Sequence, residues 1–285
     1  MPRGVPKAGY RNTKNRKAAT MTTSVPDTFE SVETFEQAEL RIRERFEVLD
    51  EFVQDSINGD VTSLIVSGPG GLGKSFRTMK ALRAWDRSKS NHSVTKGYCK
   101  ATGLYRLLWK HRHPGQVICF DDCDSVLFDE TALNFLKAAC DTSAQRIINY
   151  SAEYDMFDEE DGESIPREFQ FEGTIIFISN IDWDAQVDKG SKLAPHLGAM
   201  ISRSHYIDLG LKTKRDLLIR IKHVIEDGAL DEMELSPEEQ DDVVGFINEN
   251  ADHLRELSVR ILLKVATLRK VNPKWERAAK VSCCR

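Results

Sequence analysis

The side chains best suited to chemistry lie in one glycine-rich stretch, Gly68-Pro69-Gly70-Gly71-Leu72-Gly73-Lys74-Ser75. It matches the pattern Gly-x-x-x-x-Gly-Lys-Ser, in which glycines let backbone N–H groups turn towards a phosphate without side chains in the way. The lysine of this pattern reaches the β- and γ-phosphates of a nucleotide, and the serine hydroxyl is a ligand for Mg²⁺. The stretch therefore predicts a site for a nucleoside triphosphate, ATP, and for Mg²⁺. The expected contacts are Gly68, Pro69, Gly70, Gly71, Leu72, Gly73, Lys74, Ser75 and Phe76, with Ser75 also on the metal.

The residues on either side supply the context that such a loop requires. The apolar run 64–66 predicts a buried strand before it, and residues 76–85 predict a helix after it. The helix would present unpaired N–H groups and the positive end of its dipole to the same anion. This context disfavours the alternative, a glycine-rich turn with an incidental Lys-Ser pair.

Polar side chains follow two further apolar runs. Asp121 and Asp122 come directly after the four apolar residues 117–120, and Asn180 follows the run 174–179. Open α/β sheets bind ligands at the carboxyl ends of their strands, so these three side chains should meet at one edge. We expect Asp121 to hold Mg²⁺, directly or through water, and Asp122 to orient or deprotonate the attacking water.

The remaining pattern predicts an α/β fold, a parallel sheet sandwiched by helices, followed by a small all-α domain. Apolar residues at helical spacing predict a helix within residues 29–57, ended by Asn58-Gly59. Residues 236–239, Ser-Pro-Glu-Glu, have the form of a helix start, with a capping serine and proline at the first helical position. The other expected elements are strands at 61–66, 93–99, 146–150 and 168–171, and helices at 102–109, 127–139, 214–225, 236–250 and from 255 onwards. Residues 200–209 predict a helix end followed by a last strand.

Composition excludes several classes of protein. The chain has 285 residues, 30% of them charged, and no apolar run approaches the roughly 18 residues that a membrane helix needs. Its six cysteines form no Cys-x-x-Cys pair, which favours a reducing, intracellular (cytoplasmic) compartment. We therefore expect neither a membrane partner nor a zinc finger.

Charge is distributed unevenly along the chain. Residues 1–26 contain six basic residues and no acid, a net charge of +6. Because the whole chain carries −5, residues 27–285 carry −11. This opening stretch has too few apolar residues to pack, and we expect a disordered basic arm. It is either a solvated tail or an arm that contacts nucleic-acid phosphates. The acidic loop 153–163 is likewise either solvated or a grip for a basic partner.

These motifs together resemble the AAA+ ATPase family over roughly residues 30–270. Residues 68–75 look like its Walker A box, and Phe120-Asp121-Asp122-Cys123-Asp124 looks like its Walker B box, with Asp122 where the family usually has Glu. Asn180 matches sensor 1, which in the family positions the water against the γ-phosphate. Ser202-Arg203 resembles the Ser-Arg-Cys motif of clamp-loader subunits, so the resemblance implies that Arg203 completes the site of a neighbouring subunit.

The resemblance also implies a helical lid with a sensor 2 arginine that reaches the γ-phosphate. Arg255 and Arg260 both qualify; on one helix they would point about 140° apart, and Arg260 lies deeper in the segment. The expected domains are the arm at 1–26, the ATPase core at 27–210, the lid at 211–272 and a tail at 273–285.

Two functions follow from the resemblance. The first is an oligomeric ATPase, a hexamer, a pentamer or a hetero-oligomer with related subunits, that loads or remodels a macromolecule in DNA replication or in phage or mobile-element DNA metabolism. The alternative is a protein-remodelling or translocating motor with no nucleic-acid role. A bare ATPase core with a basic arm is similar to AAA+ ATPases of phages and mobile elements.

Overall fold

The computed structural model describes residues 33–151, 156–157, 162–211 and 213–285. The chain divides into two units, of which the second, residues 35–285, is compact. The basic arm expected at 1–26 lies outside the described residues, so its two interpretations both stay open. None of the described helices is long and apolar enough to cross a membrane.

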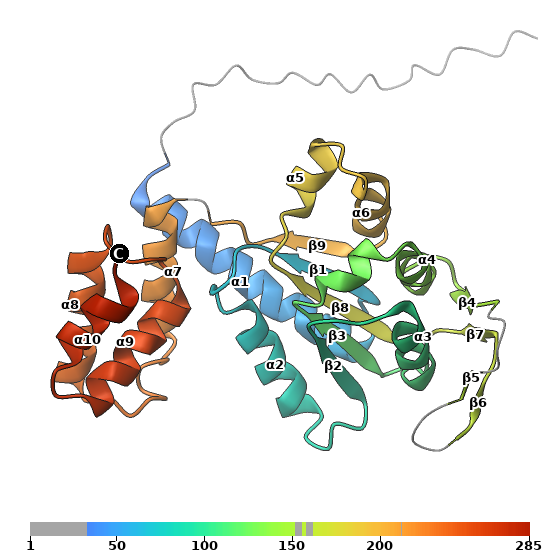
Figure 1. The fold of residues 1–285 in the computed structure, drawn as a ribbon, viewed down its shortest axis with the longest axis horizontal. Helices are drawn as coiled ribbons and strands as arrows, with labels where there is room; N and C mark the ends of the chain where they lie inside the picture. Colours follow the sequence, from blue (N-terminus) through green and yellow to red (C-terminus); the bar gives the residue numbers. More distant parts are fainter. Residues whose placement is uncertain (1–32, 152–155, 158–161, 212) are drawn as a thin grey trace, which may run out of the picture. The chain divides into compact units, whose positions relative to one another are not determined.

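The second unit is built on a parallel sheet of five strands, in the order β2-β3-β8-β1-β9 (Figure 1). Every neighbouring pair is parallel. The three central strands are buried along their whole length, which explains their continuous apolar sequences. The strands are β1 (Ser63–Ser67), β2 (His92–Lys96), β3 (Val117–Asp121), β8 (Thr174–Ser179) and β9 (His205–Asp208).

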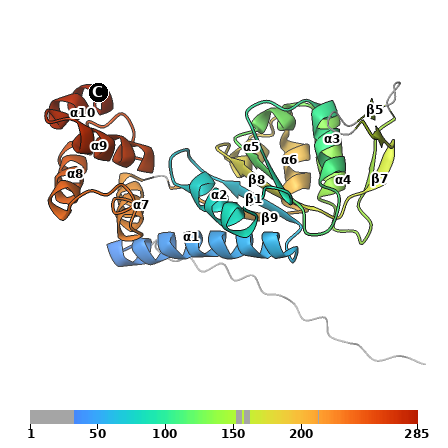
Figure 2. The ribbon, with the colours of Figure 1, turned by 90° about the horizontal axis from the view of Figure 1, so that it is seen from below.

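Alternate residues of the central strands feed two separate apolar clusters. Ile65, Ile118 and Phe177 belong to one cluster with α3 and α4, whereas Leu64 and Cys119 belong to the other with α1 and α2. Successive side chains of a strand point to opposite faces, so helices cover both faces of the sheet (Figure 2). The expected α/β fold is confirmed. The helices of this region are α1 (Phe35–Asn58), α2 (Lys74–Trp85), α3 (Ala101–Lys110), the 3₁₀-helix η1 (Asp124–Phe128), α4 (Glu130–Ala139), α5 (Trp183–Asp188) and α6 (Ala194–Ile201).

A pair of short antiparallel ladders stands between α4 and β8. β4 (Ile147–Asn149) pairs with β7 (Glu168–Gln170), and β5 (Met156–Phe157) pairs with β6 (Ser164–Ile165). The two strands expected on either side of the acidic loop are therefore present as partners. Most of the loop itself, residues 153–155 and 158–161, lies outside the described residues.

The chain after β9 forms four helices with an apolar cluster of their own. The α8 helix begins with a capping box between Ser236 and Glu239, as its sequence indicates. These helices are α7 (Lys214–Glu226), α8 (Pro237–Asn250), α9 (Val259–Val271) and α10 (Trp275–Cys283). We call them the lid.

Two features of the lid differ from the sequence-based expectation. The helix expected from Arg255 begins instead at Val259, because Ser258 caps it by accepting a hydrogen bond from the Ile261 N–H. Arg255 lies before the helix, so the angle expected between Arg255 and Arg260 does not apply. The expected tail contains the additional helix α10, which packs on α9.

Candidate nucleotide-binding site

The phosphate loop, residues 68–75, joins the end of β1 to the start of α2. Gly73 has φ +93° and forms the N-cap of α2, a left-handed conformation that side chains disfavour. Gly71 has φ +80°, and a Cβ there would lie 2.8 Å from the Cβ of Ser258 in the lid. A side chain at position 71 would therefore be disfavoured both by the left-handed backbone conformation and by the close approach of Ser258.

Lys74 lies inside the loop. Its side chain is 4% exposed, and Nζ donates to the carbonyl oxygens of Gly68 (2.6 Å) and Pro69 (2.8 Å) and to Oδ1 of Asn180 (3.0 Å). Burial lowers the pKa of Lys74 to about 8, although the carboxylate of Asp122 opposes this shift. A desolvated cation surrounded by backbone dipoles is well placed to receive an anion.

Asp121 and Ser75 meet beside this cation. The Ser75 hydroxyl donates to Oδ1 of Asp121 over 2.6 Å, and the Asp121 side chain is 3% exposed. Hydroxyl and carboxylate oxygens are the hard ligands that Mg²⁺ prefers, so this pair fits the expected metal. Lys96, at the end of β2, also forms an ion pair with Asp121, with Nζ 2.5 Å from Oδ2.

Lys96 was not anticipated. It lies opposite Asp121 in the parallel register of β2 and β3, and this register brings its ammonium to the carboxylate. Lys96 lies within the strand expected at 93–99, but nothing in the sequence fixed the register of that strand against its neighbour.

Asp122 and Asn180 are hydrogen-bonded to each other. Asn180 Nδ2 donates to Oδ1 of Asp122 over 2.7 Å, while Asn180 Oδ1 accepts from Lys74. Asp122 has φ +53°, an uncommon conformation for a residue other than glycine. Nearby, Asp124 accepts a 2.7 Å hydrogen bond from Ser179, and burial raises its pKa. The carboxyl ends of β3 and β8 thus bring the predicted side chains together.

Of the two candidate arginines of the lid, Arg260 lies at the phosphate loop. A Cβ placed on Gly70 would be 3.1 Å from an Nη atom of Arg260. The same start of α9 contributes the Val259 N–H, which donates to the Gly71 carbonyl over 2.8 Å. Arg255 is elsewhere: its N–H donates to the Cys283 carbonyl at the end of α10.

A second cation of the lid, Arg220 on α7, also contacts the loop and was missed in the sequence. It is 2% exposed; Nε donates to the Leu72 carbonyl over 3.1 Å, and the guanidinium lies 3.6 Å from the ring centroid of Phe46. Burial lowers its pKa to about 9. Arg220 therefore joins α1, α7 and the loop, and only its place in an amphipathic helix could have drawn attention to it.

A cavity of about 800 Å³ opens over the loop and is bounded by α1, α2, α7 and α9. This volume is within the usual range for small-ligand sites. Its polar lining includes Lys74, Ser75, Asp122, Asn180 and Arg260, and its apolar lining includes Ala81, Ala84, Val224, Ala229, Met233 and Leu263. The cavity thus combines cationic and polar groups that could contact phosphates with an apolar surface that could contact a base.

Arg203 is not among the residues that line this cavity. It follows α6, where Nη1 donates to the Ala199 carbonyl over 2.9 Å and Nε lies 3.7 Å from a carboxylate oxygen of Asp141. In the single chain, the structure does not bring Arg203 to the phosphate loop.

Comparison with known proteins gives one clear relative. The chain is 37% identical over 250 residues to an uncharacterized 36.7 kDa protein encoded between nrdC and mobD in Enterobacteria phage T4, and the match covers 87% of this chain and 76% of that protein. The chain belongs to the family of this phage protein. No family model matches the sequence.

Solved structures with a similar arrangement are more distant. A single-residue mutant of RuvB from Thermotoga maritima is 15% identical, with a TM-score of 0.49 over 87% of this chain and 71% of the RuvB chain. NtrX from Brucella abortus in complex with ATP is 13% identical, with a TM-score of 0.45 over 87% of this chain and 55% of NtrX. Because both TM-scores lie below 0.5, the function of neither protein is transferred to this member of the phage family.

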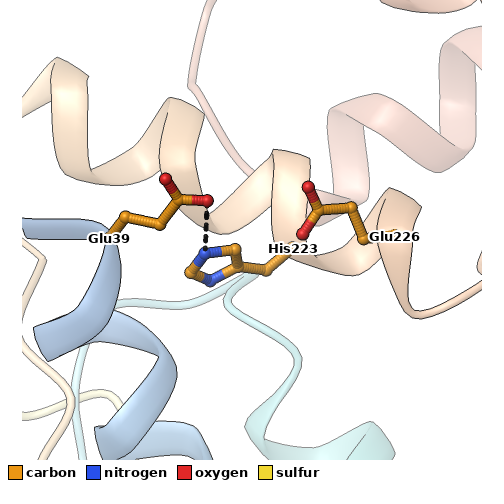
Figure 3. A group of neighbouring side chains, drawn as sticks. All are labelled: Glu39, His223 and Glu226. Carbon is orange, nitrogen blue, oxygen red and sulfur yellow. Dashed lines mark ion pairs between the residues drawn. The ribbon is translucent and has the colours of Figure 1, made fainter. Parts of the chain in front are cut away.

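Glu39, His223 and Glu226 form a separate cluster between α1 and α7 (Figure 3). Histidine and glutamate side chains can bind a metal ion, but here basic side chains form ion pairs with both glutamates. Lys222 Nζ lies 2.8 Å from Glu39 and 3.6 Å from Glu226, and Arg43 lies 2.8 Å from Glu226. Burial, followed by Arg43 and Arg220, lowers the pKa of His223 and favours the neutral ring. We interpret this cluster as an ion-pair network that joins the two helices.

Proposed function

We propose that this protein is an AAA+ ATPase that binds ATP with Mg²⁺ and hydrolyses it. The observation that carries the proposal is the hydrogen-bonded series from Lys74 through Asn180 to Asp122, beside the Ser75–Asp121 pair. These contacts support the proposal because they gather an ammonium, an amide and a carboxylate, which we assign to phosphate binding, positioning and proton acceptance, at the carboxyl edge of one parallel sheet. The local chemistry alone supports it, without any relative of known function.

The proposed roles follow from these contacts. Ser75 and Asp121 would hold Mg²⁺, which when bound neutralises charge on the transferring phosphoryl group. The Asp122 carboxylate accepts a hydrogen bond from Asn180, and none of the described residues forms an ion pair with it. Its free oxygen can therefore accept a proton from an attacking water. Asn180 contacts both Lys74 and Asp122, so it can set the distance between phosphate and base.

We also propose that the active unit is an oligomer, a ring of six or five copies or a hetero-oligomer. Arg203 lies outside the cavity of its own subunit and is partly exposed, with 34% of its side chain accessible. An arginine supplied by a neighbour would stabilise charge in the transition state, as arginine fingers do in other nucleotide hydrolases.

The substrate that we propose is a macromolecule handled in DNA replication or phage DNA metabolism, loaded or remodelled at the expense of ATP. The phage T4 relative favours this setting over the alternative, a motor that acts on protein alone. The ATPase rate measured with single-stranded DNA, with duplex DNA and with an unfolded protein separates the two. Stimulation by the unfolded protein and by neither DNA would support the alternative.

The direct test of hydrolysis is Asp122→Asn. This variant should bind ATP and Mg²⁺ but release phosphate about 10²-fold more slowly or worse, since the water loses its base. Asp188→Asn, an exposed change on α5, is the matched control and should behave as wild type. Undiminished turnover in Asp122→Asn would refute the assignment. If Asp121→Asn is instead the milder variant and binds Mg²⁺ normally, the roles of the two aspartates are reversed.

A further inference from the structure

The last 31 residues carry a strong positive net charge. Residues 255–285 contain nine basic and two acidic residues, a net charge of +7. Since the whole chain carries −5 and residues 1–26 carry +6, residues 27–254 carry −18. The end of the lid is thus a cationic segment on an acidic protein.

The α10 helix separates its apolar and basic residues. Trp275, Ala279 and Cys283 are buried, and the Trp275 ring contacts Phe246 with centroids 5.6 Å apart. Arg277 and Lys280 are exposed, and their spacing of three residues places them on one side of the helix, away from this buried row. Lys274, three residues before Arg277, continues the same side.

Backbone hydrogen bonds bring two further cations, Arg255 and Arg285, close to α10. Leu254 and Cys284 form an antiparallel bridge, the Arg255 N–H donates to the Cys283 carbonyl over 2.8 Å, and the Arg285 N–H donates to the His253 carbonyl over 2.8 Å. The Arg285 guanidinium also donates to the Arg255 carbonyl over 3.1 Å. Arg255 and Arg285 are therefore held next to the carboxyl end of α10. We call Arg255, Lys274, Arg277, Lys280 and Arg285 the basic C-terminal surface.

These five cations differ from other basic residues of the lid. Arg269 pairs with Asp242 (2.8 Å) and Glu239 (3.2 Å), and Lys270 pairs with Glu234 (3.1 Å). In the described part of the chain, no ion pair involves any member of the basic C-terminal surface, and all five are exposed. Like charges brought together without counter-charges repel one another, so this grouping does not stabilise the fold.

We propose that the basic C-terminal surface binds the phosphate backbone of nucleic acid. Neighbouring, exposed cations suit a polyanion with regularly spaced charges, whose binding needs no base contacts. An anionic membrane is disfavoured, because the only large apolar side chain exposed on the described part of α10 is Val281, and interfacial helices bury a face rich in Trp, Phe or Leu. The surface is separate from the phosphate loop, and its binding needs no hydrolysis.

The test compares charge reversals in the full chain. Arg277→Glu/Lys280→Glu removes two cations from the surface, and Lys189→Glu/Lys192→Glu makes the same change of net charge at exposed positions between α5 and α6. Binding to a fluorescent duplex and to single-stranded DNA is measured by anisotropy between ~50 and ~300 mM salt, a range in which phosphate contacts are revealed by their salt dependence.

On duplex DNA, the surface variant should lose up to ~1.8 from the slope of log affinity against log salt, which corresponds to about 60-fold in affinity near 0.1 M salt. The control should keep most of the slope. Arg277→Lys/Lys280→Arg, which preserves charge, should bind as wild type. Circular dichroism and ATP-induced thermal stabilisation check that the variants are folded and that the nucleotide site is intact, so failure of the proposed ATPase is seen separately.

Two results would overturn the proposal. An unchanged slope in the surface variant, or an equal loss in both charge-reversal variants, would show that α10 makes no phosphate contacts of its own. Binding of polyglutamate as tight as that of DNA, with the same loss in the surface variant, would assign the surface to an acidic protein instead.

Discussion

Replacing Lys74 by methionine tests whether its ammonium is desolvated as the structure indicates. Burial lowers the pKa of Lys74 from 10.5 to about 8. This difference corresponds to about 3 kcal/mol in the free energy of unfolding. Below pH 8 the folded chain bears the full cost of a buried charge. Between pH 8 and 10.5 the folded chain releases the proton while the unfolded chain keeps it, so stability due to this group rises with pH.

The pH dependence isolates this effect from the hydrogen bonds that the substitution also removes. Those hydrogen bonds, to Gly68, Pro69 and Asn180, change the stability of Lys74→Met by an amount that varies little with pH. Relative to Lys74→Met, wild type should therefore gain about 2 kcal/mol between pH ~7 and ~9.5. Urea denaturation at the two pH values measures this gain, and Lys189→Met, an exposed change, should show none.

Nucleotide gives the second readout on the same two proteins. ATP at about 100 times its dissociation constant stabilises a one-site protein by about 2.7 kcal/mol, and Lys74→Met should show no such stabilisation. A stability difference that stays constant with pH would mean that Lys74 is hydrated and titrates normally. Stabilisation of Lys74→Met by ATP to the wild-type extent would remove the basis of the nucleotide site.

Three further outcomes are expected. Arg203→Ala should bind ATP but lose about 10³-fold in turnover, and mixing it with Lys74→Ala should restore part of the activity if sites are shared between subunits. No recovery at any mixing ratio, together with a monomeric mass in the presence of ATP, would refute the proposed oligomer. Deleting residues 1–26 should leave the basal ATPase rate unchanged. If the arm contacts duplex DNA, the deletion should also lower the slope of log affinity against log salt by up to ~0.9 per phosphate contact. An unchanged slope would mean that the arm is a solvated tail. Because the pKa of His223 is lowered, only the unfolded chain gains a proton just below pH ~6.5, so the stability of the wild type should fall there as the pH drops. Thermal melts should show a smaller fall for His223→Gln, and an equal fall in the two proteins would refute the lowered pKa.

The parts of the site that the sequence predicted are those specified locally. Residues 68–75 specify their own loop, and an apolar run followed by Asp121 or Asn180 specifies a strand end. A parallel sheet then brings the strand ends together whatever the details of packing. The contributions of Lys96 and Arg220 depend instead on strand register and on how α7 packs against α1, which no local pattern encodes.

The start of α9 shows how a tertiary contact decides a local boundary. Arg255 to Lys264 could continue as one helix by composition, and Ser258 is an equally good N-cap. Backbone hydrogen bonds join Arg255 to Cys283 and Arg285 to His253, which keeps the chain before Ser258 out of a helix, and α9 begins after Ser258. That pairing spans about thirty residues and involves α10, in a stretch where the sequence indicated only a tail.

The lid and the phosphate loop are connected through consecutive peptide groups. The Gly71 carbonyl accepts from the Val259 N–H of α9, and the Leu72 carbonyl accepts from Arg220 of α7. In a trans peptide the C=O and the following N–H point in opposite directions. Carbonyls aimed at the lid therefore turn the N–H groups of Leu72 and Gly73 away from it, as an inward-facing anion site requires. The two hydrogen bonds from the lid therefore help to fix the orientation of the two peptide groups that carry these N–H groups.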